Sequence, residues 1–229
     1  MRIDAVLVEF DGVVADTFSA RRMAVDRALL DLGLSLTDDE YWDCCAGWPT
    51  SQAVRAVART RRLGLDATAL DLLALRMDRA YSSLVGKGVV LVEGARSALE
   101  RLAGRARIAA VSRLRRSDVE SLVSLAKLDH VFSFVIGEDD AYPPKPDPAP
   151  YQAALRRLDR FRGGPAGTVV ALENGVTGIR SARAAGLPCV AVGKQPAHVA
   201  IEAEAYVQSI TGMDITTLTA LLAAPEGTS

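Results

Sequence analysis

The stretch Ile3-Asp-Ala-Val-Leu-Val-Glu-Phe-Asp-Gly-Val-Val-Ala-Asp-Thr17 is the most informative part of the chain. An apolar run ends in two acids, Glu9 and Asp11, and Gly12 follows them at once. Residues two apart share one face of a strand, so we expect both carboxylates together at the carboxyl end of a buried strand. Open α/β sheets bind their ligands at that edge. A hard cation such as Mg²⁺, with a phosphate as its other ligand, would relieve the repulsion between the two acids.

Further apolar runs predict a parallel sheet, because they lack the alternation of strands that have one face in water. Together with the first run, the expected strands are Ile3–Phe10, Arg107–Ser112, Phe132–Gly137, Thr168–Glu173, Pro188–Gly193 and, as a sixth, Ala205–Ile210. Helical patterns separate them at Ala95–Leu102, Arg116–Ala126, Pro148–Leu158 and Gly175–Ala185. This alternation predicts an α/β fold, a Rossmann-like doubly wound parallel sheet.

One region interrupts the alternation. Residues 17–87 carry apolar residues at helical spacing and no convincing strand, and they come between the first and the second expected strand. We therefore expect an inserted helical cap domain at 17–87 and a core domain made of 1–16 plus 88–229. An insert at the carboxyl end of the first strand is well placed to cover the ligand-binding edge.

The composition limits the function classes. The chain has 229 residues, a formal net charge of −1, 49% hydrophobic and 24% charged residues, which is an ordinary profile for a soluble globular protein. There is no basic excess to suggest nucleic acid and no apolar run long enough for a membrane span. Three cysteines form neither a disulfide framework nor a CxxC metal site. We expect a cytoplasmic protein that binds neither nucleic acid nor membrane.

Chemistry-bearing residues follow three more of the expected strands. Ser112 ends the second, and its hydroxyl can hold a phosphate oxygen. Lys145 lies between prolines, which restrict the backbone and aim a charge that can neutralise a phosphoryl group. Glu173 and Asn174 end the fourth strand and offer oxygen ligands opposite the first acid pair. Each feature alone is common as a turn, a cap or a solvated loop, but the combination at successive strand ends is specific.

At these residues the chain resembles the haloacid dehalogenase superfamily, in its phosphatase and phosphomutase branch with a helical cap. Residues 9–17 are similar to the first motif, Asp-x-Asp-Gly-Val/Thr-x-x-Asp-Ser/Thr, and Ser112 matches the second. Lys145-Pro-Asp-Pro-Ala-Pro-Tyr151 is similar to the third motif. Leu172-Glu-Asn-Gly-Val-Thr-Gly-Ile-Arg-Ser-Ala-Arg-Ala-Ala-Gly186 resembles the fourth. The resemblance covers nearly the whole chain.

The resemblance implies a role for each matching residue. The catalytic set would be Glu9, Asp11, Ser112 and Lys145. The metal set, for Mg²⁺, would be Glu9, Asp11, Glu173 and Asn174. The substrate and phosphate set would be Ser112, Arg113 and Lys145 from the core, with Arg21, Gly47, Trp48 and Thr50 from the cap. The implied partner is a small phosphorylated metabolite, while the oligomeric state stays open.

Two positions depart from the family pattern. Glu9 stands where the family has the Asp that attacks phosphorus, and Asn174 stands where it has a metal-binding Asp. One extra methylene extends the reach of Glu9 by roughly 1 Å, and a misplacement of that size can cost about 100-fold in rate. Asn174 keeps an oxygen ligand but removes a negative charge, so Mg²⁺ binding should be weak.

Three readings of the function follow. The first is a phosphatase-type hydrolase, slowed by Glu9 and Asn174. The second is a non-catalytic protein that binds a phosphorylated ligand or a partner on the same fold. A sugar-phosphate mutase is less favoured, since those relatives carry a cap His where this chain has Arg21 and an Arg where it has Thr50.

Overall fold

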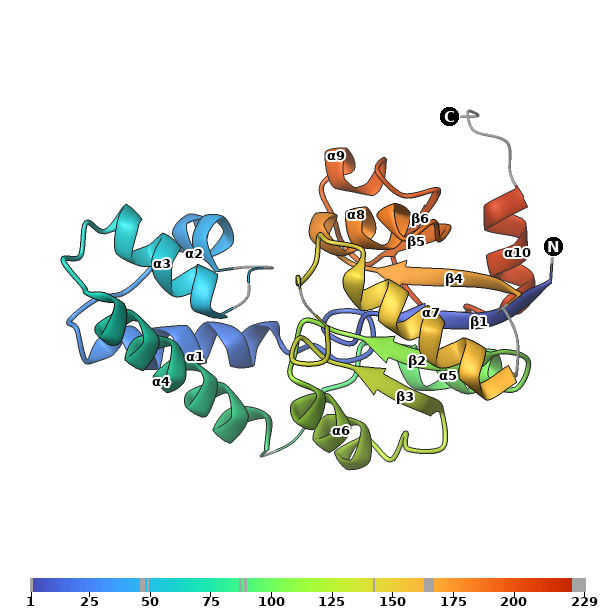
Figure 1. Cartoon of the computed structure of the whole chain (residues 1–229), viewed down its shortest axis with the longest axis horizontal. Coiled ribbons are helices and arrows are strands. Elements are labelled where there is room, and N and C mark those ends of the chain that lie inside the picture. Colours follow the sequence, from blue (N-terminus) through green and yellow to red (C-terminus); the bar gives the residue numbers. More distant parts are fainter. Residues whose placement is uncertain are drawn as a thin grey trace. The chain divides into compact units, whose positions relative to one another are not determined.

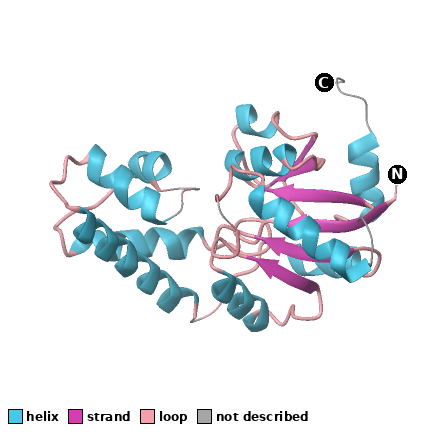
Figure 2. Ribbon diagram, in the orientation of Figure 1, coloured by secondary structure: helices cyan, strands magenta, loops and turns pink. Residues whose placement is uncertain are grey.

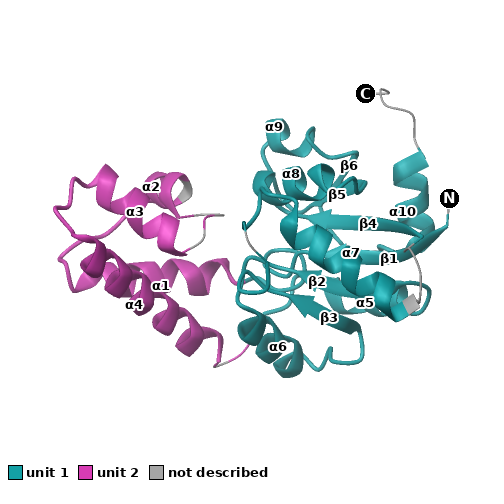
Figure 3. Ribbon diagram, viewed as in Figure 1, with its two compact units in different colours: residues 1–16, 89–229 teal, residues 17–88 magenta. Residues whose placement is uncertain are grey.

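The computed structural model describes residues 2–45, 48, 50–86, 88, 90–141, 143–162 and 167–223. The chain divides into two compact units (Figure 3). Unit 1 comprises Met1–Asp16 and Val89–Ser229, and unit 2 comprises Thr17–Gly88. Each unit has its own apolar core. No helix in the described part of the chain is both long and apolar enough to cross a membrane.

Unit 1 is built on one parallel sheet of six strands in the order β3-β2-β1-β4-β5-β6 (Figures 1 and 2). The strands are β1 (Ile3–Val8), β2 (Arg107–Val111), β3 (Phe132–Ile136), β4 (Thr168–Glu173), β5 (Cys189–Val192) and β6 (Ala205–Val207). The predicted α/β fold with its six-stranded parallel sheet is confirmed. The last strand is shorter than expected and only half-buried, because it lies at the edge of the sheet.

Helices connect the strands and cover the sheet. Those of unit 1 are α5 (Ala95–Ala103), α6 (Arg116–Leu125), α7 (Ala149–Arg162), α8 (Val176–Ala184), α9 (Ala197–Ala200) and α10 (Ile215–Ala223). Alternate residues of β1, such as Ala5 and Leu7, share one apolar core with Leu158 of α7 and Ile179 of α8. The residues between them are also buried, so the strand is covered on both faces, as its continuous apolar run predicts.

Unit 2 consists of helices in its described part: α1 (Phe18–Leu30), α2 (Asp38–Cys44), α3 (Thr50–Thr60) and α4 (Ala67–Val85). Its core includes Leu29, Tyr41, Val57 and Met77. The start of α2 is set locally by Thr37, whose hydroxyl accepts the backbone N–H of Glu40 while the Glu40 carboxylate accepts the N–H of Thr37. Helical spacing in the sequence thus corresponds to helices packed on a separate core.

Strand order positions the site in unit 1. Because β1 lies between β2 and β4, the carboxyl ends of these three parallel strands meet at one edge of the sheet. Glu9, Ser112 and Glu173 come at those three ends, although more than 160 residues of chain separate the first from the last. The same edge receives the loop before α7, which carries Lys145.

Candidate active site

The carboxylate of Glu9 is at the centre of the carboxyl edge and is fully buried. Its Oε1 accepts the Ser112 hydroxyl at 2.6 Å and the backbone N–H groups of Phe10 at 2.8 Å and Asp11 at 3.2 Å. The side chain therefore turns back onto the backbone that follows β1.

The other oxygen of Glu9 faces two cations. Oε2 accepts a hydrogen bond from Lys145 Nζ at 3.0 Å and lies 3.7 Å from Arg113 Nε. The Lys145 ammonium is itself buried, and it also donates to the carbonyl oxygen of Val111 at 2.7 Å and to Glu173 Oε1 at 2.5 Å. Lys145 thus joins the ends of β1, β2 and β4 through a single charged group.

Glu173 is the second buried carboxylate of the site. Its Oε1 accepts the Tyr151 hydroxyl at 2.6 Å as well as Lys145, and its Oε2 accepts the backbone N–H of Asn174 at 3.2 Å. A Cβ on Gly178 would lie 2.0 Å from Glu173 Oε2, so only glycine leaves room for the carboxylate there. Gly178 of the fourth motif is therefore required by the close packing of the Glu173 carboxylate.

The pKa values of the two buried carboxyl groups, Glu9 and Glu173, are shifted in opposite directions. Burial opposes the charge of Glu9, but Lys145, Arg113 and the Ser112 hydroxyl outweigh it and lower the pKa of Glu9 below its ordinary value. Burial and the nearby charge of Glu9 raise the pKa of Glu173 against the pull of Lys145. Burial also opposes the charge of Lys145, but Glu173 and Glu9 raise its pKa, so the ammonium stays charged. Glu9 is accordingly the carboxylate that holds its charge more strongly.

One buried oxygen without a partner among the described residues suits a hard cation at this edge. Asn174 Oδ1 is buried and has no hydrogen-bond partner among the described residues. The Asn174 amide packs on Gly12, where an added Cβ would lie 1.9 Å from Nδ2, so it lies beside the backbone that follows Asp11. Buried polar oxygens normally have a partner, and an amide oxygen with a carboxylate is a donor set that Mg²⁺ accepts. These residues fit a magnesium site with one acid fewer than the family pattern, because the amide of Asn174 stands where that pattern has a carboxylate.

The structure brings together seven of the predicted site residues: Glu9, Asp11, Ser112, Arg113, Lys145, Glu173 and Asn174. Sequence reasoning missed the buried Tyr151 and the carbonyl of Val111. Tyr151 is the last residue of the third motif, and that place in the motif is the signal that could have pointed to it. The Val111 carbonyl has no signal in the sequence, because every residue carries one.

The predicted cap residues belong to unit 2 and are described within it. The Arg21 guanidinium lies over the Tyr81 ring, 5.4 Å from its centroid. Trp48 is 43% exposed and lines a cavity of about 720 Å³ beside α3, which begins at Thr50. Gly47 lies outside the described residues. Their predicted contact with substrate stays a prediction.

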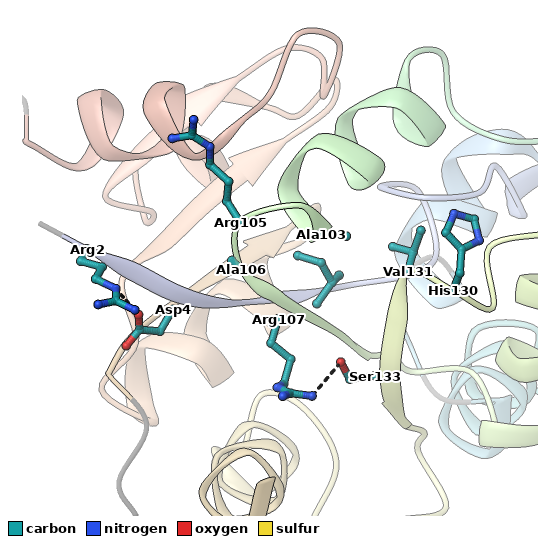
Figure 4. Close-up of a pocket in the computed structure, with 10 residues that line it drawn as sticks. Arg2, Asp4, Ala103, Arg105, Ala106, Arg107, His130, Val131 and Ser133 are labelled. Atoms are coloured by element: carbon teal, nitrogen blue, oxygen red, sulfur yellow. Dashed lines mark hydrogen bonds and ion pairs between the residues drawn. The ribbon is translucent and has the colours of Figure 1, made fainter. Parts of the chain in front are cut away.

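A hollow of unit 1 lies at the opposite, amino edge of the sheet (Figure 4). It measures about 390 Å³ and is lined by residues at the starts of β1, β2 and β3. Arg2 pairs with Asp4 at 3.1 Å, and Arg107 donates to Ser133 Oγ at 3.3 Å. These side chains are pointed at their own neighbours rather than at a common centre, so this hollow is not the candidate site.

Comparisons with known proteins identify the family of the chain. A model of the haloacid dehalogenase-like hydrolase family matches residues 6–192. Protein CbbY of Rhodobacter capsulatus is 29% identical over 202 residues, which are 83% of this chain and 85% of CbbY. The plasmid-encoded phosphoglycolate phosphatase of Cupriavidus necator is 28% identical over 185 residues, 80% of this chain and 78% of that protein.

A solved structure shows the same fold. The crystal structure of CbbY from Rhodobacter sphaeroides in complex with phosphate superposes with a TM-score of 0.76 at 23% identity, and the match covers 92% of this chain and 96% of that one. The family model spans four fifths of the sequence, from β1 to β5, and thus includes every strand that contributes to the site. The chain therefore belongs to the haloacid dehalogenase-like hydrolase family.

Proposed function

We propose that this protein is a phosphatase-type hydrolase that cleaves a small phosphorylated metabolite to an alcohol and inorganic phosphate. One observation carries the proposal: Ser112, Lys145 and Arg113 converge on a single buried carboxylate at the carboxyl edge of the sheet. A hydroxyl and two fixed cations are what a transferring phosphoryl group needs around its oxygens.

The roles follow from position and chemistry. Ser112 and Lys145 hold the phosphoryl oxygens, with Arg113 as a further cation. Glu9 is the nucleophile or a metal ligand, and Asp11, two residues further along, is the general acid and base. As acid, Asp11 gives its proton to the leaving oxygen, and as base it takes one from the water that completes hydrolysis. Glu173 and Tyr151 hold the Lys145 ammonium in place.

Magnesium fits this proposal as a weakly held cofactor. Asp11 and Asn174, with Glu9 and Glu173 as further candidates, are the residues that would hold it. When bound, Mg²⁺ supplies positive charge to the phosphoryl oxygens. The orphaned Asn174 oxygen supports the site, and the amide in place of a carboxylate is the reason to expect low affinity.

The substrate class is proposed from the relatives and from unit 2. A phosphoglycolate phosphatase and a CbbY solved with phosphate both point to small phosphorylated compounds. We propose that unit 2 is a cap that contributes Arg21, Trp48 and Thr50, together with Gly47, to substrate selection. The cytoplasmic location expected from the sequence remains a prediction.

The test is turnover of a panel of small phosphate esters in the presence of Mg²⁺, measured as release of inorganic phosphate. The site variant is Lys145→Ala, and the matched control is Lys194→Ala, which removes an exposed lysine. We expect turnover by the unchanged protein and by the control, and loss of turnover in the site variant. Equal rates in all three proteins would show that the activity comes from elsewhere.

A second function is favoured by a specific observation. Both oxygens of Glu9 are held by protein donors, which suits a protein that binds a phosphorylated ligand without cleaving it. Phosphate binding without turnover of any ester would support this reading. A sugar-phosphate mutase is less favoured, and the residues at Arg21 and Thr50 give no reason to prefer it.

A further inference from the structure

Five donors of unit 1 surround the Glu9 carboxylate. Ser112 Oγ and the N–H groups of Phe10 and Asp11 bind Oε1, while Lys145 Nζ and Arg113 Nε face Oε2. We call these five donors the oxyanion seat. Backbone N–H groups, a hydroxyl, an ammonium and a guanidinium form a mixed set that suits a phosphate at least as well as a carboxylate.

The seat is already filled by the protein itself. A carboxylate can accept about four hydrogen bonds through its two oxygens. The four hydrogen bonds to Glu9 reach that number, and Arg113 adds charge from 3.7 Å. The site is buried, so water cannot replace these bonds at low cost. A second anion therefore cannot use the same donors while Glu9 keeps them.

The Glu9 side chain bonds donors from its own strand end and from other elements. Its carboxylate reaches back to the N–H groups of the two residues that follow it. A side chain one methylene shorter would hold its oxygens roughly 1 Å closer to the backbone of β1, which changes their distances to the Ser112 hydroxyl and the Lys145 ammonium on other elements. The glutamate thus combines the position of a nucleophile with the reach of an internal ligand.

We infer that the Glu9 carboxylate is an internal oxyanion that occupies the phosphate seat, so that a phosphate or phosphoryl group binds only by displacing it. The inference rests on the proposed function, because it takes the seat to be the phosphate site. It adds that the Glu9 carboxylate competes with phosphate for the same donors and so lowers the affinity of the protein for phosphate. Inorganic phosphate should bind weakly to the unchanged protein and tightly once the side chain is removed.

The experiment is calorimetric titration of inorganic phosphate into the full chain, in EDTA to remove divalent cations. We expect Glu9→Ala to bind phosphate at least about tenfold more tightly than the unchanged protein, which corresponds to about 1.4 kcal/mol. Glu9→Gln keeps the size of the side chain but removes its charge, so it should give a smaller gain. It serves as the second variant if Glu9→Ala fails to fold, as judged by circular dichroism.

Two controls separate displacement from loss of charge. Asp11→Ala removes the same charge two residues away and should gain no more than about threefold, since that change is only a longer-range Coulomb effect. Adding Lys145→Met to Glu9→Ala should abolish the gain, because it removes a donor of the seat. An equal gain in Asp11→Ala, or no gain in either Glu9 variant, would overturn the inference.

The outcome is separate from that of the proposed function. Tighter phosphate binding in Glu9→Ala with no turnover of any ester by the unchanged protein would leave the inference standing and remove the phosphatase. Turnover by the unchanged protein, without any gain in phosphate affinity in Glu9→Ala, would support the phosphatase and overturn the inference.

Discussion

The two edges of the sheet in unit 1 both carry charged pairs, but they differ in burial. At the carboxyl edge the side chains of Lys145, Glu9 and Glu173 are at most 2% exposed. At the amino edge the Arg2 side chain is 93% exposed, and its partner Asp4 is 18% exposed. The N–O distances are alike, 3.0 Å between Lys145 and Glu9 against 3.1 Å between Arg2 and Asp4.

The difference shows that environment, and not distance, decides what an ion pair does. An exposed pair gains little, because water and salt screen it and its side chains lose freedom. A buried pair interacts strongly but has lost its hydration, so removing one partner leaves an uncompensated charge. The carboxyl edge is thus held in one arrangement by charges that depend on each other, which suits a binding site. At the amino edge, by contrast, the Arg2 member of the pair is almost fully exposed.

The largest effect is expected from Lys145→Met. The variant removes the ammonium that two buried carboxylates share, and we expect the free energy of unfolding to fall by about 3–5 kcal/mol. Chemical denaturation followed by circular dichroism measures this. Lys194→Met removes an exposed lysine and should change the value by less than about 0.5 kcal/mol. If Lys145→Met were as stable as the Lys194 control, the buried ion pairs of the carboxyl edge would contribute no more to stability than an exposed charge.

Tyr151→Phe should have the next largest effect. It keeps the ring beside Lys145 but removes the hydroxyl that donates to Glu173, so a buried acceptor loses a partner. We expect a loss of about 1–3 kcal/mol in the free energy of unfolding. The control is Tyr206→Phe on the edge strand β6, where the same hydroxyl is removed from a half-buried site. Equal losses in both variants would mean that the hydrogen bond from Tyr151 to Glu173 contributes no more to stability than a half-buried hydroxyl does.

Glu9→Asp tests the length of the buried acid. The shorter side chain should release the oxyanion seat and place the carboxylate at the family's position, so we expect phosphate-ester turnover to rise about tenfold, or about 1.4 kcal/mol of barrier. The measurement is kcat/KM from phosphate release. A fall from a robust activity would show that the site is adapted to glutamate and that the argument from reach is wrong.

Asn174→Asp tests the charge at the cation site. A carboxylate in place of the amide should tighten Mg²⁺ binding about fivefold, or roughly 1 kcal/mol, because ligand charge sets affinity for hard cations. Calorimetric titration with Mg²⁺ compares it with the unchanged protein and with Gln208→Glu, which adds the same charge at an exposed position. Equal or weaker binding by Asn174→Asp would mean that the cation is bound elsewhere.

The smallest effect is expected at the amino edge. Arg2→Ala removes an exposed pair with Asp4 and should change the free energy of unfolding by less than about 0.5 kcal/mol. The measurement is the same chemical denaturation, repeated at low and high salt. A loss above about 2 kcal/mol would show that this edge is coupled like the other, and would remove the contrast between them.

The fold class and the position of the site along the chain follow from the amino-acid sequence alone. Buried parallel strands leave continuous apolar runs, and the residues that follow them, such as Glu9, Ser112 and Glu173, are read directly from where those runs end. The family motifs added the order of these residues. They also identified Glu9 and Asn174 as departures, which no periodicity could have done.

How the site residues share their hydrogen bonds is visible only in the three-dimensional structure. That Glu9 turns back onto Phe10, that Lys145 bridges two carboxylates, and that Tyr151 supports Glu173 all depend on side-chain rotamers. Those rotamers are selected by groups that come from distant parts of the chain. Burial then gives each charge its value, and burial is a property of the packed structure rather than of any local pattern.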